Sequence, residues 1–338
     1  MIKVTSPSNI AIVKYWGKYG RQLPRNASVS FTLSNAVSKT TMQYYPKNGK
    51  ESKLTFYLDG VEKPGFAQKI DNFFKGIEDY LPFLRDFDFV FESHNTFPHS
   101  SGIASSASGM SAVAMCLGQM EVELHRANEI DLQKVSLLAR LGSGSACRSV
   151  YPVMAVWGEH TEWKGSSNEF AVCIQDEVHE VFHHFHDDIL IVSDKEKSVS
   201  STAGHGLMDG NPYAESRYEQ ANKHMSMLKP ILRSGDVESF GELAELEALT
   251  LHALMMSSNP SYILMQPNTI EVIYRIRAFR AESKLPVYFT LDAGPNVHIL
   301  YPTDVKDKAQ QFIREELMSL AHNGQILRDH VGQGTILV

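Results

Sequence analysis

Hydrophobic and polar positions alternate along parts of the first hundred residues in a way that predicts β-strands. Residues 38–45 and 52–58 are rich in β-branched and aromatic side chains and are bounded by turn residues. Residues 88–92 alternate polar and apolar side chains, as a half-buried strand does. Between these strands, apolar residues recur at helical spacing and predict a helix over residues 66–81.

Helical spacing of apolar residues becomes the dominant pattern further along the chain. Small residues after Gly102 are compatible with a helix as far as residue 120. Further helices are predicted over residues 131–140, 213–232, 237–256, 269–282 and 304–321. Further strands are predicted over residues 152–157, 169–174, 189–192, 287–291 and 297–301. Because strands give way to helices near residue 185, we expect an α+β protein with domains at 1–185 and 186–338.

Composition narrows the class of protein. The 338 residues are 43% hydrophobic and 21% charged, as in an average soluble globular protein. Apolar runs are far shorter than the ~20 residues that span a bilayer, and the first residues do not resemble a secretion signal. The net charge of −7 argues against a nucleic-acid scaffold, and three cysteines without a CxxC pair suit a reducing compartment. We therefore expect a cytoplasmic enzyme with no membrane or nucleic-acid partner.

Residues 98–109 (PHSSGIASSASG) lie between a predicted strand and a predicted helix. Their small side chains let the backbone approach a ligand closely, and a helix N-terminus offers unpaired N–H groups to phosphate. The hydroxyls of Ser105 and Ser106 are candidates for binding phosphate oxygens or a Mg²⁺ ion. No lysine follows the glycine, so the segment is not the GxxxxGK[ST] nucleotide loop. A tight turn with small-residue packing is the alternative.

Two further segments combine basic and hydroxyl side chains. Residues 142–149 (GSGSACRS) place two serines before Arg148, whose guanidinium can bind a carboxylate or a phosphate bidentately. The alternative is a helix-ending turn with Arg148 at the surface, and we interpret Cys147 as a packing residue. Residues 9–18 (NIAIVKYWGK) carry two lysines four residues apart at a strand end, a pattern that a solvated strand edge explains equally well.

Acidic residues occur in three other patterns. In residues 290–296 (TLDAGPN), an apolar run ends at Asp292, where a carboxylate can act as a base, orient a hydroxyl or simply begin the turn. Residues 179–188 crowd His and Asp side chains without the spacing of a metal site, and we interpret them as a surface strand or turn between the domains. Residues 236–247 are predicted to form a solvated helix face.

Together and in this order, these segments resemble the mevalonate diphosphate decarboxylases of the GHMP kinase superfamily. They match the family signatures NIAxxKYWGK, PxxxGLASSAxG, GSGSAxRS and DAGPN, and residues 199–204 (VSSTAG) resemble a fifth element, VSSTxG. The resemblance spans residues 9–296. It implies a GHMP kinase fold with a ribosomal-protein-S5-like N-terminal domain, a ferredoxin-like C-terminal domain and the active site between them. It also implies a cytoplasmic homodimer.

The reaction implied by the resemblance is the ATP- and Mg²⁺-dependent decarboxylation of mevalonate 5-diphosphate to isopentenyl diphosphate. In that scheme Asp292 positions the 3-hydroxyl and accepts its proton, Lys14 offsets the charge of the phosphates, and Arg148 binds the C1 carboxylate. The implied substrate-binding residues are Asn9, Ala11, Tyr15, Lys18, Ser143, Gly144, Ser145, Arg148 and Ser200. The implied ATP-binding residues are Ser101, Gly102, Ala104, Ser105 and Ser106, with Asn95 a candidate by position alone; the Mg²⁺ ligands would be Ser105 and Ser106.

A few positions depart from the family pattern. His99 stands in the phosphate loop where the family has Thr or a small apolar residue, and we expect it to be exposed. His205 stands where the family often has Met, and we expect its imidazole to strengthen diphosphate binding in acid. Arg25 adds a positive charge that reaches either substrate or solvent.

Several other functions remain open from the sequence. A decarboxylase of 5-phosphomevalonate and a mevalonate 3-kinase are close variants. A non-catalytic ATP-binding regulator and a sugar or homoserine kinase are more remote ones.

Overall fold

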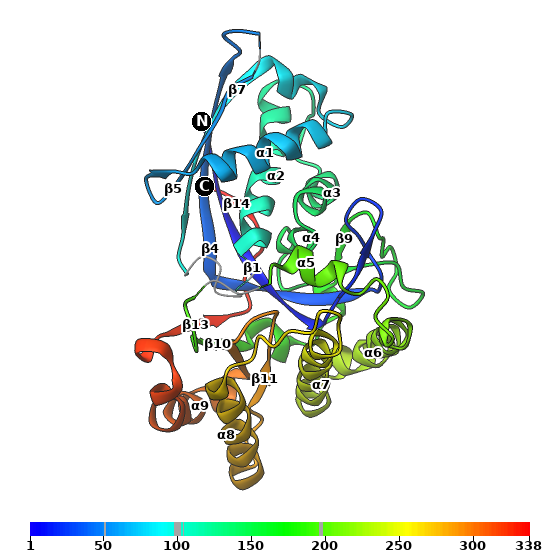
Figure 1. The fold of residues 1–338 in the computed structure, drawn as a ribbon, viewed down its shortest axis with the longest axis vertical. Coiled ribbons are helices and arrows are strands. Elements are labelled where there is room, and N and C mark those ends of the chain that lie inside the picture. The colour runs from blue at the N-terminus through cyan, green and yellow to red at the C-terminus, as the bar shows by residue number, and fades with distance from the viewer. Residues whose placement is uncertain (51, 98–102, 104, 196–198) are drawn as a thin grey trace.

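The computed structural model describes residues 1–50, 52–97, 103, 105–195 and 199–338. The chain forms an upper part that contains the larger β-sheet and a lower part that contains a smaller one (Figure 1). The N- and C-terminal ends both lie on the upper part (Figure 1).

The larger sheet has eight strands within the described residues. They are β1 (Ile2–Val13), β4 (Ser28–Pro46), β5 (Leu54–Leu58), β6 (Val61–Glu62), β7 (Phe87–Asn95), β8 (Met154–Trp157), β9 (Ala171–Cys173) and β14 (Ile336–Leu337). Their order is β14-β1-β4-β7-β5-β6, and β8 joins β4 and β9. The β1–β4 register shifts between Pro7 and Asn9 and again between Ala11 and Val13. Such shifts bend a strand, and they bring the end of β1 toward the lower part.

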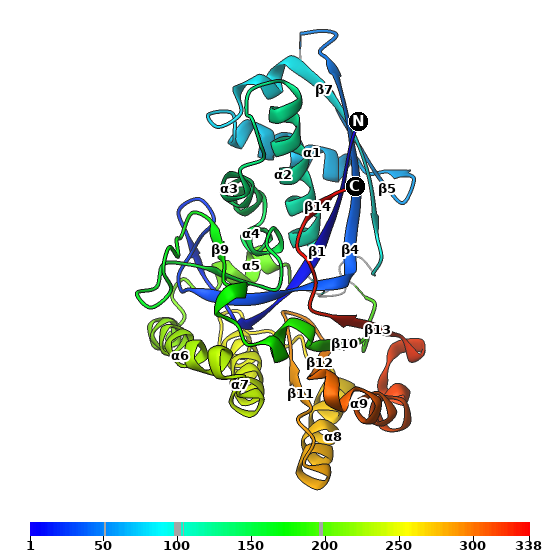
Figure 2. The same ribbon diagram turned by 180° about the vertical axis from the view of Figure 1, so that it is seen from behind.

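Helices cover one side of the long strands β1 and β4 in both ribbon views (Figures 1 and 2). They are α1 (Pro64–Gly76), α2 (Ser105–Glu123), α3 (Leu132–Gly142) and the short α4 (Ala146–Ser149). On α1, Ile70, Phe73 and Phe74 recur at helical spacing and are buried. The small residues of α2 are buried on nearly all sides, which lets this helix lie close to both the sheet and α3.

The lower part is built on a four-stranded antiparallel sheet of order β11-β12-β10-β13. Its strands are β10 (His186–Leu190), β11 (Tyr288–Thr290), β12 (Val297–Tyr301) and β13 (Ile326–His330). Its helices are α6 (Ala214–Ser234), α7 (Val237–Met256), α8 (Pro267–Ser283) and α9 (Lys306–Phe312), whereas the short α5 (Ser201–Gly206) lies near α4 in both ribbon views (Figures 1 and 2). Helix α7 lies directly on β11, because a Cβ at Gly241 would come within 2.1 Å of the Tyr288 ring.

One hydrophobic cluster bridges the two parts, beside others that lie within each part. A single cluster of buried side chains joins Ile10 and Phe31 of the larger sheet to Phe182, Met225 and Phe240 of the lower part. A two-stranded hairpin, β2 (Lys18–Tyr19) and β3 (Leu23–Pro24), follows β1. After β13 the chain returns to the upper part, where β14 pairs with the start of β1. The packing is therefore continuous between the two parts, although the sequence changes from strand-rich to helix-rich near residue 185.

Most predicted elements are present within a few residues of their expected bounds, and the helix over 237–256 coincides with α7. The single helix over 304–321 is wrong. Helix α9 ends at Phe312, and a π-helical turn (Ile313–Leu317) and a 3₁₀ turn (Met318–Leu320) follow it. The wider turn keeps both Ile313 and Leu317 buried against the core of the lower part.

Residues 179–188 form a 3₁₀ turn followed by β10, as the strand-or-turn interpretation predicts, but part of the segment is not at the surface. Asp187 and Asp188 are fully buried. The Asp187 carboxylate accepts a hydrogen bond from His298 Nδ1 at 2.8 Å, and Asp188 accepts one from the Tyr301 hydroxyl at 2.8 Å. These buried acids therefore belong to the core of the smaller sheet.

The acidic segment 236–247 is a solvated helix face only in part: Asp236, Glu238 and Glu242 are exposed, and the prediction is wrong for the last two acids. Glu245 and Glu247, both on α7, are 4% and 0% exposed. Glu245 pairs with arginines of α8, and Glu247 pairs with Arg217 of α6. A charge run looks solvated in sequence when its partners come from other helices.

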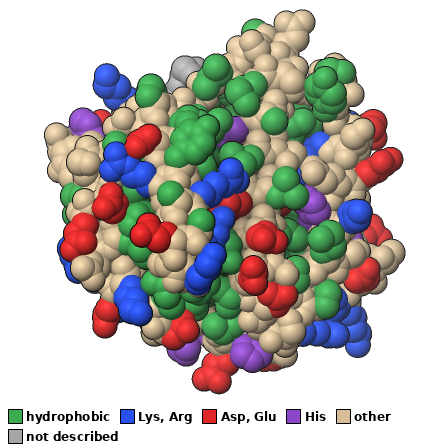
Figure 3. Space-filling view, turned by 90° about the horizontal axis from the view of Figure 1, so that it is seen from below, with side chains coloured by type: hydrophobic (Ala, Val, Ile, Leu, Met, Phe, Trp, Pro, Cys, Tyr) green, Lys and Arg blue, Asp and Glu red, His purple; other side chains and the backbone are tan. Residues whose placement is uncertain are grey.

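None of the helices in the described ranges is both long and apolar enough to cross a membrane. Seen from below, hydrophobic, basic and acidic side chains are interspersed over the surface (Figure 3). The three cysteines are free: Cys116 and Cys147 are buried, and Cys173 is exposed.

Candidate active site

A cavity of about 600 Å³ lies where the end of β1 and the start of α2 meet the lower part of the chain. All five sequence segments singled out above contribute to its wall. The predicted site residues that line it are Asn9, Ala11, Lys14, Tyr15, Lys18, Asn95, Ser105, Ser106, Ser143, Ser145, Arg148, Ser200 and Asp292. Asn9 and Asp292, 283 positions apart in sequence, therefore meet in one place.

Gly144 is the exception among the described candidates. A Cβ at this position would come within 2.8 Å of both the Tyr15 hydroxyl and the Trp157 ring, so the glycine permits close packing behind the cavity. Ser101, Gly102 and Ala104, together with His99, lie outside the described residues.

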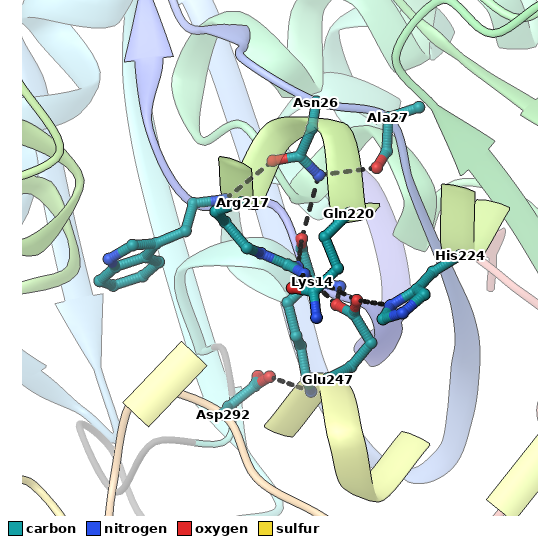
Figure 4. A network of polar contacts seen from close by, with 9 residues as sticks. Lys14, Asn26, Ala27, Arg217, Gln220, His224, Glu247 and Asp292 are labelled. Atoms are coloured by element: carbon teal, nitrogen blue, oxygen red, sulfur yellow. Dashed lines mark hydrogen bonds and ion pairs between the residues drawn. The ribbon is translucent and has the colours of Figure 1, made fainter. Parts of the chain in front are cut away.

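An ion pair joins the two parts of the chain at the cavity. Lys14 Nζ lies 2.9 Å from Asp292 Oδ1, and the side chains are 2% and 24% exposed (Figure 4). Lys14 directly follows β1, and Asp292 stands in the turn between β11 and β12. That turn is fixed by the Thr269 hydroxyl, which donates to the Pro295 carbonyl at 2.6 Å, and by Asn296 Oδ1, which accepts from the Ser193 N–H at 3.0 Å. The carboxylate is thus held at the cavity wall with an ammonium group beside it.

Arg148 is a buried cation whose hydrogen-bond partners are neutral among the described residues. Its Nε donates to Ser30 Oγ at 2.8 Å, and its Nη1 donates to Ser28 Oγ at 2.5 Å. The guanidinium lies over the Tyr15 and Trp157 rings at 5.6 and 5.8 Å. Burial lowers its pKa, although nearby Cys147, Tyr15 and Asp292 act in the opposite direction. The alternative that placed Arg148 at the surface is therefore wrong. The cavity offers the guanidinium of Arg148 to an anionic ligand.

Burial shifts the pKa values of two other residues, both in segment 9–18. Burial raises the pKa of Tyr15, and the neighbouring Arg148 opposes this shift. Burial lowers the pKa of Lys18 to about 8, and its ammonium donates to Gln22 Oε1 at 2.7 Å. Arg25 is exposed and lies over the Tyr19 ring at 5.3 Å, on the hairpin rather than in the cavity wall. Lys18 is therefore the cation that this hairpin presents to the cavity.

Hydroxyl groups line the cavity at the start of α2. Ser105 and Ser106 begin this helix, and Ser106 Oγ lies 3.2 Å from Ser143 Oγ. Hydroxyl oxygens near a helix start fit a phosphate group, and they also fit Mg²⁺, which prefers oxygen ligands. Ser200 caps α5, where its Oγ accepts a hydrogen bond from the Ala203 N–H at 3.2 Å.

His205 lines the cavity in a role that the sequence did not predict. Its Nδ1 accepts a hydrogen bond from the Gly17 N–H at 3.0 Å, and its ring lies 4.6 Å from Tyr15 and 4.3 Å from Trp16. Only an unprotonated Nδ1 can accept this bond. The bond from Gly17 therefore requires Nδ1 without a proton, and the effect of His205 on diphosphate binding in acid stays a prediction.

The cavity also has an apolar wall that sequence reasoning missed. Its described residues come from β5 and α1 and are Phe56, Leu58, Phe66, Ile70 and Phe73, with Lys69 beside them. The period of the α1 pattern identified a buried helix face but could not show that part of it faces a cavity. Glu247, Arg217 and His252, which surround the Lys14–Asp292 pair, also gave no signal in the sequence.

Comparisons with known proteins agree with this arrangement. Residues 6–169 match the family model of the diphosphomevalonate decarboxylase-like N-terminal domain, and residues 188–332 match that of the mevalonate 5-diphosphate decarboxylase C-terminal domain. The diphosphomevalonate decarboxylase of Homo sapiens is 30% identical over 92% of this chain and 78% of its own length.

Solved structures resemble the whole chain. MDDEF in complex with MVAPP, AMPPCP and magnesium has a TM-score of 0.84 at 29% identity, over 99% of this chain and 98% of its own. The mevalonate diphosphate decarboxylase of Staphylococcus aureus has a TM-score of 0.86 at 26% identity, over 100% of this chain and 97% of its own.

Proposed function

The chain belongs to the diphosphomevalonate decarboxylase family, and on this premise we propose that it catalyses the ATP-dependent decarboxylation of mevalonate 5-diphosphate to isopentenyl diphosphate. The fold is α+β and GHMP kinase-like. One observation carries the residue assignments: an ion-paired carboxylate, Asp292, and a buried guanidinium with neutral partners, Arg148, line the same cavity.

The substrate would lie in the polar half of the cavity. Its C1 carboxylate would pair with Arg148, because a planar guanidinium matches a carboxylate bidentately and this one has no carboxylate among its hydrogen-bond partners in the described residues. Its 3-hydroxyl would face Asp292, and its 5-diphosphate would bind Lys18 and the nearby hydroxyls. The residues proposed for substrate binding are Asn9, Ala11, Tyr15, Lys18, Ser143, Ser145, Arg148 and Ser200.

The nucleotide would occupy the other half. The apolar wall of β5 and α1 suits a planar base, and the hydroxyls of Ser105 and Ser106 suit the phosphates. Asn95, which accepts a hydrogen bond from Ser38 at 2.7 Å, is proposed to contact the nucleotide between these two regions. Ser105 and Ser106 are the proposed Mg²⁺ ligands, and the ion would neutralise phosphate charge when bound.

The reaction follows from this placement in two steps. In the first step, the oxygen of the tertiary 3-hydroxyl bonds to the γ-phosphorus of ATP and ADP leaves, while Asp292 accepts the proton of that hydroxyl. The C3–O bond then breaks as phosphate departs, the electrons of the C1–C2 bond form the C2=C3 double bond, and CO₂ leaves. The proton on Asp292 would pass to the departing phosphate, so the carboxylate would be anionic again and stabilise positive charge at C3, while Lys14 offsets the negative charge of the phosphates. Phosphoryl transfer depends mainly on such alignment and charge.

Product analysis tests this proposal. The protein would be incubated with Mg-ATP and, separately, mevalonate, its 5-phosphate or its 5-diphosphate, with ADP and CO₂ measured independently. We expect both products from the 5-diphosphate. ADP without CO₂ would support a mevalonate 3-kinase, turnover of the 5-phosphate alone would support a phosphomevalonate decarboxylase, and neither product would support a regulator.

We also propose a cytoplasmic homodimer with domains at 1–185 and 186–338. The free cysteines are compatible with a reducing compartment. The two family matches, at 6–169 and 188–332, support a boundary near residue 185. Sedimentation velocity at several protein concentrations would test the dimer.

A further inference from the structure

Three buried side chains hold the backbone of Lys14. Its N–H donates to Glu247 Oε2 at 2.8 Å, and its carbonyl accepts from Arg217 Nη2 at 2.8 Å and from Asn26 Nδ2 at 3.0 Å (Figure 4). Lys14 comes directly after β1, whose register with β4 ends at Val13. Its position therefore depends on side chains from α6 and α7 of the lower part.

The Glu247 carboxylate has bonding partners on both oxygens and is fully buried. Oε1 accepts from Arg217 Nη1 at 2.8 Å and pairs with His224 Nδ1, while Oε2 accepts from Arg217 Nη2 at 2.5 Å and from the Lys14 N–H. Burial opposes ionisation, but the Arg217 guanidinium and these hydrogen bonds hold the pKa of Glu247 below its usual value. The carboxylate is an anchor that cannot shift without breaking several bonds at once.

The same helix also holds the backbone of Asp292. His252 lies five residues after Glu247 on α7 and is 1% exposed. Its Nε2 donates to the Asp292 carbonyl at 3.1 Å. Burial lowers the pKa of His252 to about 4, so the ring is neutral near pH 7 and carries its proton on the nitrogen that donates. One rigid helix thus contacts the main chain at both members of the Lys14–Asp292 pair.

We propose that Glu247 and His252 are positioning residues, and that α7 fixes the Lys14 ammonium and the Asp292 carboxylate relative to each other. This inference rests on the proposed function, in which Lys14 and Asp292 act on the substrate. Neither Glu247 nor His252 lines the cavity in the described part of the chain, so each acts through the residue it holds. A reaction that relies on alignment is sensitive to such support, because a 1 Å misplacement can cost about 100-fold in rate.

The test compares four single substitutions. Glu247→Gln keeps the shape of the side chain and removes its charge. His252→Met removes the donor to Asp292, and His252→Gln returns a donor to that position. Glu245→Gln is the matched control, because Glu245 is on the same helix, is 4% exposed and pairs with Arg277 and Arg280, away from the Lys14–Asp292 pair. Thermal unfolding, kcat and both KM values are measured for each variant.

We expect Glu247→Gln and His252→Met to lower kcat about 10- to 100-fold while both KM values stay within about threefold. His252→Gln should recover most of the lost kcat, and Glu245→Gln should lower the melting temperature with little change in kcat. Should Glu247→Gln fail to fold, the two His252 variants decide the matter alone.

Two outcomes would overturn the inference: kcat within about threefold of wild type in Glu247→Gln and His252→Met, or equal losses in all four variants. The Asp292→Asn variant separates this from the proposed function. If wild type lacks the reaction, or if Asp292→Asn is fully active, the proposed function fails and takes this inference with it. If Asp292→Asn is inactive and the α7 variants are not, only this inference fails.

Discussion

Replacing Arg148 with Met should separate stability from substrate binding. Methionine keeps much of the length and removes the buried charge. The lost hydrogen bonds to Ser28 and Ser30 are worth about 1.5–3 kcal/mol each, because the donor is charged. Burying a cation costs several kcal/mol, which the substitution recovers. These contributions oppose each other, so the free energy of unfolding without ligand should change by no more than about 2 kcal/mol.

Substrate binding should change much more. Removing one partner of a buried charge pair costs about 3 kcal/mol or more, which is roughly 100-fold in Kd. At a concentration of mevalonate 5-diphosphate about 100 times its Kd, the wild-type protein gains about 2.7 kcal/mol of stability, whereas the variant would gain about 0.4 kcal/mol. With roughly 2 °C per kcal/mol for a long chain, the ligand should raise Tm by about 5 °C in wild type and about 1 °C in the variant.

Differential scanning fluorimetry with and without the ligand measures both quantities. Arg140→Met is the matched control, since Arg140 is also buried but pairs with Glu169 at 2.5 Å and donates to the Arg21 carbonyl at 2.6 Å. The control should lose stability and keep the ligand-induced shift. A ligand-induced shift in Arg148→Met as large as in wild type would refute the assignment of Arg148 to the substrate carboxylate.

Four further predictions concern single groups. Asp292→Asn should lower kcat by about 1,000-fold or more, measured as ADP and CO₂ release, and a loss below about tenfold would contradict its role as base. His205→Met removes the acceptor of the Gly17 N–H, so the substrate KM should rise relative to wild type, and an unchanged KM would contradict a role for this contact in shaping the cavity. Burial lowers the pKa of Lys18 to about 8, so kcat/KM of wild type should fall above that pH as the cation is lost. Lys18→Arg should abolish this fall. A variant whose pH profile of kcat/KM matches that of wild type would count against Lys18 as a diphosphate ligand. Burial raises the pKa of Asp188 to about 6, so ionisation of this carboxyl costs stability above pH 6, and proton uptake stabilises the native state as pH falls from 6 toward 3.8. The Tm of Asp188→Asn minus that of wild type should therefore increase from pH 5 to pH 8. A constant difference would refute this.

Much of the fold and the polar half of the site could be predicted from the chain itself. Hydrophobic periodicity located α7 and most other helices, because each buries one face over several turns. The motifs around Lys14, Arg148 and Asp292 named residues that do line one cavity, because each motif ends a strand or begins a helix at that cavity.

What the sequence could not provide depends on contacts between distant segments. Lys14 and Glu247 are 233 positions apart, and nothing near Glu247 in sequence distinguishes it from a solvated acid. Gly144 belongs to a motif, yet it permits packing behind the cavity rather than lining it, because the neighbouring Tyr15 and Trp157 leave no room for a side chain. The apolar wall on α1 could not be recognised because a helical period gives the direction of burial without the identity of the surface it meets.

The return of β14 to the edge of β1 has a consequence for how the protein can be divided. Thr5 pairs with Ile336 and Val4 with Leu337, and the Thr335 hydroxyl bonds to Ser6 at 2.8 Å. A fragment that stops near residue 185 would lack this strand and would expose a row of free N–H and C=O groups along β1. Such an open edge tends to pair with other chains, so isolated N-terminal fragments should aggregate even though a family boundary lies close to that point.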